Sequence, residues 1–585
     1  MIEIQSELSE IIFHALWLQI EPQNIVLQTP PRKEFWDLCF WVFDIVKILR
    51  ISPHVVTQKI VDFFQSYSQN TLIDALSVEW PYINIKIWKE YYTQMFSDFF
   101  LQKDYYKAFH GQSWAKETII IDYIGANVWK PLHIGHMCTP LQGQVCANVF
   151  TKLWYQVITD SHIGDWGIIF WKLIVAYKKY GDEQKLVSNA VEHLFELYVL
   201  ISHDAEEDTN LDAEFRAAFK LLSEWNSELV ELWKKFTASS IYFMNILLWR
   251  LFVKPDYNIW ESFYEWLGLP KMENYPDLTY SMKDIVEELI VKWIATKNDD
   301  NSVWVVFSEA SKLPSCILQK RDGTHGYLAS DLACIKYRVQ NWNPQKILYF
   351  VDVRQQLHFR QAFMIARLAW WVPDTTELTH AHNWFISLKD GAMSTRKGRI
   401  IKLWALLDEA HVRAKNIILE KRSDISEENM QILAEKVWIW AIKYGYLKKS
   451  RELDSVFDWD EFMTFEWNSG PYIQYGYVRA KKILSEYTFQ EISYVFSEDI
   501  EVQLIQKLLD FPDIIHEIKS EYNFHQLCLY IYELTKIFST LYAKLPILSE
   551  NNMSVRNSRC ALLMCFTEII EESFSLLWIE LPLEM

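Results

Sequence analysis

The sequence predicts an α/β fold, in which a parallel-sheet domain lies between a mixed N-terminal unit and a helical C-terminal unit. Two apolar runs, "ETIIIDYIGANV" (117–128) and "KILYFVDV" (346–353), have the character of buried strands, and the first leads through a turn into a helix. From about residue 405 onward the pattern is helical almost throughout. The 585 residues also exceed what one core can organise, since domains of about 100–200 residues imply roughly three or four of them.

The N-terminal unit is expected to span residues 1–112. A helical pattern around 55–66 precedes "YINIKI" (82–87), which alternates as a half-buried strand does. We therefore predict a small α/β domain in this region.

The central domain is expected over residues 113–405. Its first apolar run has the strand–loop–helix order with which nucleotide-binding α/β domains begin. Residues from about 180 to 300 are charged, amphipathic and helix-like, as an insertion into a sheet domain would be. In the C-terminal unit, 406–585, apolar residues recur at spacings of three and four on one helix face: Leu527, Ile531, Leu534, Phe538 and Leu541.

Composition argues against several classes of protein. No uninterrupted apolar run reaches transmembrane length, and the acidic start "MIEIQSELSEII" lacks the basic segment and cleavage site of a signal peptide. Eight cysteines without a CxxC pair indicate reduced thiols rather than disulfides or a zinc site. We expect a cytoplasmic protein with no membrane association and no metal ion held by a dedicated set of side chains.

The net charge of −18 argues against a protein that coats nucleic acid indiscriminately. A local basic surface could still bind RNA in one register, and "KKSRE" (448–452) and "RAKKIL" (479–484) are candidates. Solvated helix faces are the alternative for both segments.

The stretch "NVWKPLHIGHMCTPLQG" (127–143) places a His-Ile-Gly-His turn where the first strand gives way to a helix. Two histidines three apart can bind zinc, but this pair lacks a third ligand and a neighbouring general base. Phosphate binding suits it better, because Gly135 lets backbone approach a nucleotide and His133 and His136 can donate hydrogen bonds to phosphate oxygens at a helix N-terminus. A purely structural histidine pair is the alternative.

A second segment, "AMSTRKGRIIKL" (392–403), combines hydroxyls, two cations and a glycine in a short loop. Ser394, Arg396 and Lys397 would suit the stabilisation of charge on a departing pyrophosphate. A solvated turn is the alternative for this segment alone, but the two segments in this order are far more specific than either one.

With these two segments the sequence resembles the class I aminoacyl-tRNA synthetases, and the arginyl family among them. The signature HIGH stands verbatim at 133–136, and "MSTRKG" has the form found in arginyl-tRNA synthetases. Further segments are similar to that family in the same order: "SHIGDWG" (161–167), "YLASDLA" (327–333), "VDVRQQLHF" (351–359), "LLDEA" (406–410), "AIKYGYLK" (441–448), "NSGPYIQYGYVRA" (468–480) and the ending "ELPLEM".

The resemblance implies the fold and the parts of the site. It implies a Rossmann-like catalytic domain with helical insertions, an arginyl-specific N-terminal domain that contacts tRNA, and an all-α anticodon-binding domain from about residue 460. It also implies a set of ATP-binding residues, namely Lys130, His133, Gly135, His136, Ser394, Arg396 and Lys397. The arginine-binding positions would be Asp122, Asn127, Glu261, Tyr327, Asp331 and Gln355. Carboxylates suit a guanidinium because they bind its planar fork bidentately.

The reaction implied by the resemblance has two steps. The arginine carboxylate attacks the α-phosphate of ATP, with Mg²⁺ assisting, and pyrophosphate leaves. The terminal ribose hydroxyl of tRNA(Arg) then takes the arginyl group. Tyr472, Tyr475, Tyr477 and Arg479 are candidates for contact with unstacked tRNA bases, and core packing is the alternative for each tyrosine. The family implies a monomer and a dependence of arginine activation on bound tRNA.

Three other interpretations remain. A class I synthetase for another amino acid is disfavoured by the acidic pocket residues and the N-terminal domain. A smaller HxGH nucleotidylyltransferase would not need the helical domain. A non-catalytic relative that binds arginine or tRNA would be favoured by loss of the two histidines or the loop lysine, which are all present. Ala392 stands where many class I loops begin with lysine, so Lys130 or Arg396 could share that role.

Tryptophan is abnormally frequent and glycine abnormally rare. The chain has 27 Trp and 15 Gly, whereas a glycine share of about 7% would give roughly 40. Many of the tryptophans stand where the arginyl family favours glycine: Trp80, Trp129, Trp171, Trp260, Trp384, Trp438, Trp440, Trp467 and Trp578. Trp166 and Trp459 stand where tryptophan is expected.

An indole supplies neither the positive φ nor the space that glycine gives a turn. We hypothesise that UGA codons meaning glycine in the source organism are written here as tryptophan. A divergent, genuinely tryptophan-rich enzyme is the alternative.

Overall fold

The computed structural model describes residues 2–28, 30, 37–67, 72–79, 82–103, 116–127, 130–166, 168–208, 210–223, 226–265, 275–384, 386–387, 401–421, 426–463, 468–488 and 494–582. The chain forms two compact units. The first comprises Met1–Tyr105, Ala480–Phe511 and Lys536–Thr567, and the second comprises Tyr106–Arg479, Pro512–Thr535 and Glu568–Met585.

The N-terminal part of the first unit is a four-stranded antiparallel sheet with helices beside it. The strands lie in the order β1 (Leu27–Gln28), β2 (Leu38–Trp41), β4 (Tyr82–Ile87) and β3 (Ile73–Glu79), and the helices are α1 (Ile2–Leu16), α2 (Phe43–Leu49), α3 (Pro53–Ser66) and α4 (Lys89–Gln102). Helix α3 begins at Pro53 because Ser52 caps it, accepting a hydrogen bond from the Val55 N–H. The predicted α/β domain is therefore confirmed, with its predicted strand at 82–87.

Helices from the C-terminal region complete this unit. Helix α18 (Asp499–Leu509) packs on α4, where Gln506 donates a hydrogen bond to Asp37 at 2.7 Å and Lys89 pairs with Asp499 at 2.6 Å. Arg559 of α21 (Met553–Leu576) is buried and binds Glu501 at 2.7 Å.

The second unit is built on a four-stranded parallel sheet, in the order β13 (Glu377–His380), β12 (Lys346–Tyr349), β5 (Thr118–Asp122) and β6 (Gln156–Asp160). Helix α6 (Cys138–Lys152) connects β5 to β6, and α13 (Gln356–Leu368) connects β12 to β13 in the opposite direction. Because parallel crossovers are right-handed, these two helices cover opposite faces of the sheet.

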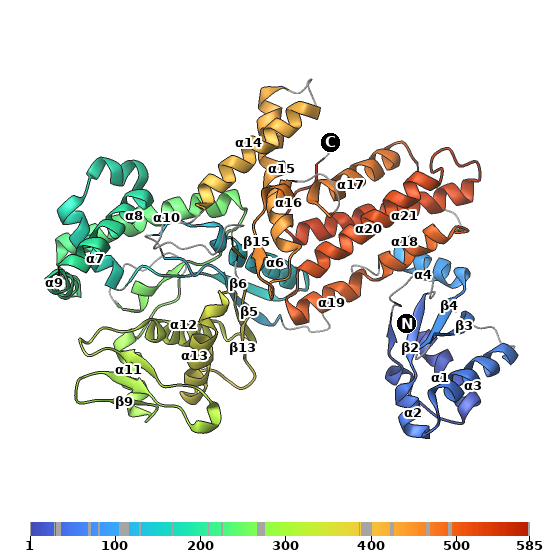
Figure 1. Cartoon of the computed structure of the whole chain (residues 1–585), viewed down its shortest axis with the longest axis horizontal. Helices are drawn as coiled ribbons and strands as arrows, with labels where there is room; N and C mark the ends of the chain where they lie inside the picture. The colour runs from blue at the N-terminus through green and yellow to red at the C-terminus, as the bar shows by residue number, and fades with distance from the viewer. Residues whose placement is uncertain are drawn as a thin grey trace. The chain divides into compact units, whose positions relative to one another are not determined.

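One face of this sheet carries a large apolar core. Ile120 of β5 and Ile347 of β12 pack with buried residues of α12 (Tyr327–Trp342) and α13, which lie side by side in Figure 1. Helix α6 approaches the end of β5 closely at Gly143, where an added Cβ would lie 2.2 Å from the Cβ of Tyr123. That close contact holds the start of α6, and the turn before it, against the strand end.

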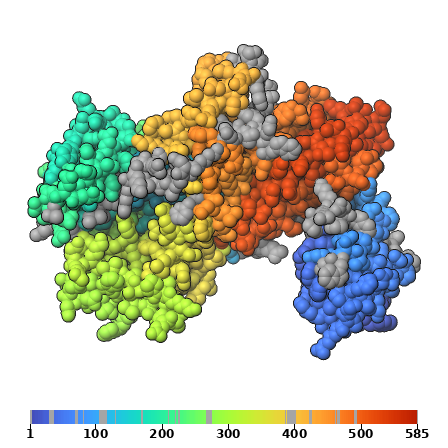
Figure 2. All heavy atoms as spheres, viewed as in Figure 1, coloured from blue at the N-terminus to red at the C-terminus, as the bar shows by residue number. Residues whose placement is uncertain are grey.

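The insertion is helical in its first part only. Helices α7 (Ile168–Tyr180), α8 (Glu183–Glu207), α9 (Leu211–Ser223) and α10 (Ser227–Arg250) pack together and form a continuous block of surface, green in Figure 2. After them come α11 (Met282–Val291) and an antiparallel sheet of β9 (Ala295–Lys297), β10 (Val303–Val305) and β11 (Cys316–Gln319). The sequence did not predict these strands, because segments of three or four residues are too short to show a period.

The C-terminal region is helical as predicted. Its helices are α14 (Leu403–Lys421), α15 (Glu427–Leu447), α16 (Trp459–Met463), α17 (Gly470–Ser485), α18, α19 (Phe511–Glu521), α20 (His525–Lys544) and α21. The predicted apolar face of α20 is buried, with Leu527, Ile531, Leu534 and Leu541 fully enclosed. A two-residue strand, β15 (Ser455–Val456), pairs with β14 (Ile386–Ser387) and is the one described exception.

All eight cysteines are described and carry free thiols, as expected. No described helix is both long and apolar enough to cross a lipid bilayer.

Candidate active site

The parallel sheet has one position where its connections diverge. From the neighbouring strands β5 and β12, one connection runs outward to β6 and the other to β13. In folds of this kind, ligands commonly bind beside such a switch point, at the carboxyl ends of the two strands. The His133–His136 turn follows β5, and a 3-10 turn, Val353–Gln355, follows β12.

The histidine turn has a defined hydrogen-bond pattern. The Gly135 N–H donates to Nδ1 of His133 at 3.1 Å, and the His133 N–H donates to Nδ1 of His136 at 3.1 Å. The two rings lie with their centroids 3.9 Å apart. Because each Nδ1 accepts, each imidazole carries its proton on Nε2 and can donate it to an incoming acceptor.

Both histidines are neutral at physiological pH. Burial lowers the pKa of His133 to about 4, with help from the positive charges of Lys130 and Arg354. Burial likewise lowers the pKa of His136 well below its usual range. These imidazoles are therefore hydrogen-bond donors rather than cations.

Arg354 is a residue that sequence reasoning missed. It comes from the turn after β12, and its guanidinium acts electrostatically on both histidines. Asp352 holds it as a fork, with Nε to Oδ1 at 2.9 Å and Nη2 to Oδ2 at 2.7 Å. The signal was its place beside Gln355 in "VDVRQQLHF", directly after the second predicted strand.

The predicted loop residues Ser394, Arg396 and Lys397 lie outside the described residues. The segment that follows them pairs with the histidine turn, since the Ile134 N–H donates to the Ile401 carbonyl at 3.1 Å and the Leu403 N–H donates to the Leu132 carbonyl at 2.8 Å. The end of this distant segment is thus tied to the turn at His133.

Two aspartates at the strand ends form buried ion pairs with one arginine. Arg338 of α12 is fully buried, and its Nη2 lies 2.7 Å from Asp122 Oδ2 and 2.7 Å from Asp160 Oδ2. Burial raises the pKa of each aspartate, and Arg338 opposes that rise. Asp122, expected to line an arginine pocket, therefore has a cation partner of its own.

Asp331 lies between two histidines. Its Oδ2 is 2.6 Å from His358 Nε2, and its Oδ1 is 3.7 Å from His162 Nε2. Burial alone would raise the pKa of Asp331, but the hydrogen bond and charge of His358 lower it on balance. Asp331 therefore stays a carboxylate.

Glu261, like its neighbour Asp165, is a buried carboxylate that forms no ion pair among the described residues. It opens a 3-10 turn, Glu261–Tyr264, that Asp165 holds by accepting hydrogen bonds from the Ser262 N–H at 2.9 Å and hydroxyl at 2.6 Å. Glu261 is 7% exposed, and no cation within the described parts of the chain forms an ion pair with it. Burial, followed by the nearby charges of Asp165 and Asp331, raises the pKa of Glu261 well above its usual range.

The other three residues predicted to bind arginine differ in exposure and in their partners. Tyr327 is half exposed, and its pKa is raised by burial and by the charge of Glu261. Asn127 forms an isolated parallel β-bridge with Gly164, and a Cβ added at Gly164 would lie 2.5 Å from Asn127 Oδ1. Gln355 is exposed at the end of its turn.

The four residues predicted to contact tRNA all lie on α17 but differ in exposure. Tyr475 is exposed and stacks on the Arg479 guanidinium at 3.9 Å, whereas Tyr477 is buried and donates to Glu571 at 2.7 Å. Tyr472 packs against Tyr532 with 5.9 Å between ring centroids.

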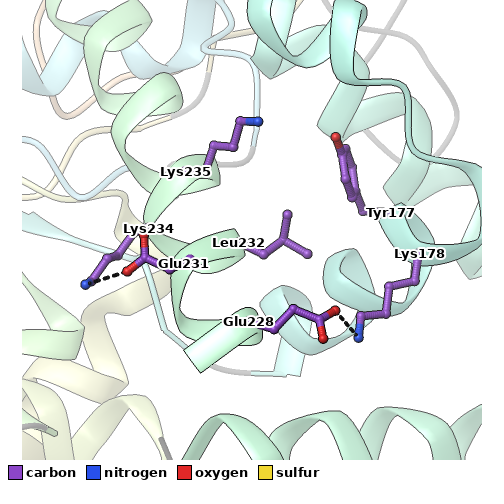
Figure 3. A pocket seen from close by; sticks show the side chains of 7 residues that line it. All are labelled: Tyr177, Lys178, Glu228, Glu231, Leu232, Lys234 and Lys235. Carbon is purple, nitrogen blue, oxygen red and sulfur yellow. Dashed lines mark hydrogen bonds and ion pairs between the residues drawn. The ribbon is translucent and has the colours of Figure 1, made fainter. Parts of the chain in front are cut away.

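A surface hollow of about 680 Å³ lies away from these residues, between α7 and α10 (Figure 3). Its charges are already paired, with Lys178 2.8 Å from Glu228 and Lys234 3.0 Å from Glu231. None of the predicted site residues lines it.

The parallel sheet with its switch point and the His133–His136 turn define an α/β domain of the class I synthetase type. Three family models agree: "tRNA synthetases class I (R), catalytic domain" matches residues 98–459, "DALR anticodon binding domain" matches 473–585, and "Arginyl tRNA synthetase N terminal domain" matches 3–87.

Individual relatives are similar along the whole chain. An "Arginine--tRNA ligase" from Fusobacterium nucleatum is 33% identical over 573 residues, which cover 96% of this chain and 95% of that protein. One from Halothermothrix orenii is 30% identical, with full coverage of both. The chain belongs to the arginyl-tRNA synthetase family.

Solved structures share the fold. The arginyl-tRNA synthetase of Plasmodium falciparum matches with a TM-score of 0.76 at 22% identity, covering 100% of this chain and 99% of that one. That of Thermus thermophilus matches with a TM-score of 0.75 at 19% identity and full coverage of both. The predicted fold class is confirmed.

Proposed function

We propose that this chain is an arginine–tRNA ligase, which activates L-arginine with ATP and transfers it to the 3′ end of tRNA(Arg). The observation that carries the proposal is Glu261, a buried carboxylate whose charge no described cation balances. A buried carboxylate without a cation is unfavourable unless a ligand brings one. In an arginyl-tRNA synthetase fold, the guanidinium of arginine is the cation that fits.

The arginine site is assigned to the acid cluster. Glu261 and Asp331 would take the two edges of the guanidinium, with Tyr327 beside them. Asn127 and Gln355 would hold the α-amino acid end, near the carboxyl ends of β5 and β12. Asp122 would act indirectly, since Arg338 already binds it.

The ATP site is assigned to the histidine turn and the distant loop. Neutral Nε2–H groups of His133 and His136 would donate to phosphate oxygens, with Lys130 near them. Ser394, Arg396 and Lys397 would follow the pyrophosphate as it leaves. The arginine carboxylate then needs only correct placement in line with the α-phosphate, so no protein nucleophile is required.

Mg²⁺ is expected to arrive with ATP. No group of three or more metal-binding side chains occurs in the described ranges, and magnesium typically takes most of its ligands from phosphates and water. When bound, it would neutralise charge on the phosphates.

The helical C-terminal domain would contact the tRNA anticodon, and the N-terminal domain would contact another part of the tRNA. Of the α17 residues, exposed Tyr475 with Arg479 is best suited to stack on an unstacked base, whereas Tyr477 is suited to packing. We also propose that the protein is a cytoplasmic monomer.

The test is aminoacylation of tRNA(Arg) with arginine, lysine and citrulline, each added with ATP. Citrulline has the shape of arginine without its charge. We expect arginine to be preferred over citrulline by about 10⁴-fold in kcat/KM, since citrulline would leave buried carboxylates unpaired. Charging with lysine or citrulline at a comparable rate would refute the assignment. Binding of arginine without charging would instead identify a non-catalytic relative.

A further inference from the structure

Four helices end in the same way, and each end carries a tryptophan. Helices α6, α11, α13 and α21 close with a Schellman motif, in which the residue at C′ has left-handed φ and two backbone bonds run back to the last turn. The residues at C′ are Trp154 (φ 66°), Trp293 (φ 61°), Trp370 (φ 59°) and Trp578 (φ 56°).

The bonds identify the motif without ambiguity. At α11, the Trp293 N–H donates to the Ile290 carbonyl at 3.0 Å, and the next N–H donates to the Leu289 carbonyl at 2.9 Å. The other three ends repeat this pair of bonds, at 2.9 and 3.1 Å for Trp370. A fifth tryptophan, Trp17 (φ 54°), ends α1 with the single-bond variant, donating to Phe13.

Glycine is the usual residue at this position, because an L side chain disfavours positive φ. In the described ranges, tryptophan supplies five of the thirteen non-glycine residues with positive φ, although it makes up only 27 of 585 residues. Only one described glycine, Gly323, has positive φ. Phe252 closes α10 in the same way, so this chain does not exclude an aromatic residue there.

Two of these indoles gain little from their positions. Trp293 is 94% exposed and Trp370 is 88% exposed, and neither indole ring makes a hydrogen bond or ring contact among the described residues. The adjacent Trp371 is different, because it is 9% exposed and its Nε1 donates to Glu288 at 2.8 Å. One tryptophan of this neighbouring pair packs as an indole normally does, and the other points into solvent.

We propose that the protein made in its source cell carries glycine at positions 17, 154, 293, 370 and 578. The five positions are selected by backbone geometry, and four of them lie outside the set that family resemblance suggested. A codon read as glycine in the cell and written as tryptophan here accounts for both the left-handed helix ends and the shortage of glycine.

The decisive experiment is mass spectrometry of tryptic peptides from the native protein. The peptide 368–389 contains Trp370 and Trp371, and the peptide 153–172 contains Trp154 and Trp166. We expect glycine at 370 and 154, and tryptophan at 371 and 166, whose ring packs on Trp233. Tryptophan at any of the five assigned positions overturns the proposal, and glycine at both 371 and 166 overturns the structural criterion.

A second experiment uses recombinant protein with the printed sequence. Trp293→Gly and Trp370→Gly should each raise the Tm, because they relieve a left-handed non-glycine residue without removing packing. The matched control Trp371→Gly should lower it. A lower Tm for both test variants would contradict the proposal.

A different observation concerns Asp331 and rests on the proposed function. His358 lies in the first turn of α13 and holds Asp331 Oδ2 at 2.6 Å, while His162 Nε2 lies 2.9 Å from the hydroxyl of the neighbouring Ser330. His162 Nε2 also lies 3.7 Å from Asp331 Oδ1, so histidines from two separate elements flank the carboxylate and His358 makes its hydrogen bond. We infer that His358 is a positioning residue, which turns the Asp331 carboxylate so that its free edge meets the guanidinium.

The test compares His358→Leu, which removes the donor, with His358→Gln, which keeps a donor at a similar reach. We expect the arginine KM of His358→Leu to rise about tenfold or more, with the ATP KM unchanged, because charged hydrogen bonds orient strongly. His358→Gln should recover most of the loss. An unchanged arginine KM in His358→Leu would refute the positioning role, whereas failure of the parent protein to charge tRNA would refute the proposed function instead.

Discussion

Binding of arginine should release a proton from Glu261. Burial, then the charges of Asp165 and Asp331, raises the pKa of Glu261 well above its ordinary value, so at pH values below this raised pKa the free protein holds the carboxyl protonated. A guanidinium stabilises the carboxylate and lowers that pKa again. Below the free-state pKa, binding must therefore expel one proton, and arginine binds more tightly as pH rises until the free-state pKa is passed.

The magnitude follows from one linked proton. Each pH unit in this range should change the arginine dissociation constant about tenfold, or ~1.4 kcal/mol. His358 acts in the same direction, since its pKa is raised by Asp331 against the effect of burial, and its protonated form offsets the Asp331 charge at low pH. The other groups of the cluster are Asp122, Asp160, His162 and Arg338.

Isothermal titration calorimetry in buffers of different ionisation enthalpy counts the released protons directly. Glu261→Gln should abolish the release from this site and weaken arginine binding by about 10²–10⁴-fold, because losing one partner of a buried ion pair costs about 3–5 kcal/mol. Glu265→Gln is the matched control, since Glu265 follows in the same turn but lies 3.2 Å from His325. Absence of proton release from the parent protein at every pH from mildly acid to neutral would refute the reasoning.

Three other predictions concern the rest of the unit. Arg338→Met should lower the free energy of unfolding by about 3–5 kcal/mol in denaturant titrations, because Asp122 and Asp160 would stay buried without a cation, whereas Lys283→Met at an exposed pair should change it by less than about 1 kcal/mol. Arg354→Ala should raise the KM for ATP about tenfold and leave arginine affinity unchanged; an effect on arginine alone would contradict its place beside the histidines. The affinity for ATP should show no histidine titration between pH 6 and 8, because the pKa of His133 is about 4. A change in ATP affinity near pH 6.5 that is lost in His133→Asn would contradict this prediction.

Local patterns were enough to predict the elements that are long or strongly periodic. The strand 82–87, the buried face of α20 and the donor turn at His133 all follow from spacing and from turn chemistry over a few residues. The three short strands β9–β11 carry too few residues for a period to show. Family resemblance supplied Glu261 and Asp331, which no local pattern marks.

Contacts between distant segments could not be predicted. Arg338 meets Asp160 across 178 residues and Asp122 across 216, and nothing near Arg338 in the sequence marks it as the partner of two strand ends. His358 meets Asp331 from a separate helix for the same reason. The left-handed helix ends at Trp293 and Trp370 are likewise visible only once backbone dihedrals are known.

The two halves of the proposed site would use opposite electrostatics, and the neutral histidines explain how both could lie at one edge of the sheet. Lys130 and Arg354 already place positive charge near the histidine turn, where the proposal puts the phosphates. Two further cations at His133 and His136 would hold the triphosphate and the released pyrophosphate equally tightly, which favours binding without favouring the reaction. They would also repel the guanidinium bound at Glu261. Neutral Nε2–H donors avoid both effects, because the hydrogen bonds that they donate become stronger only as charge develops on a phosphate oxygen. Burial of the turn, which lowers both histidine pKa values, would therefore serve catalysis at the proposed site.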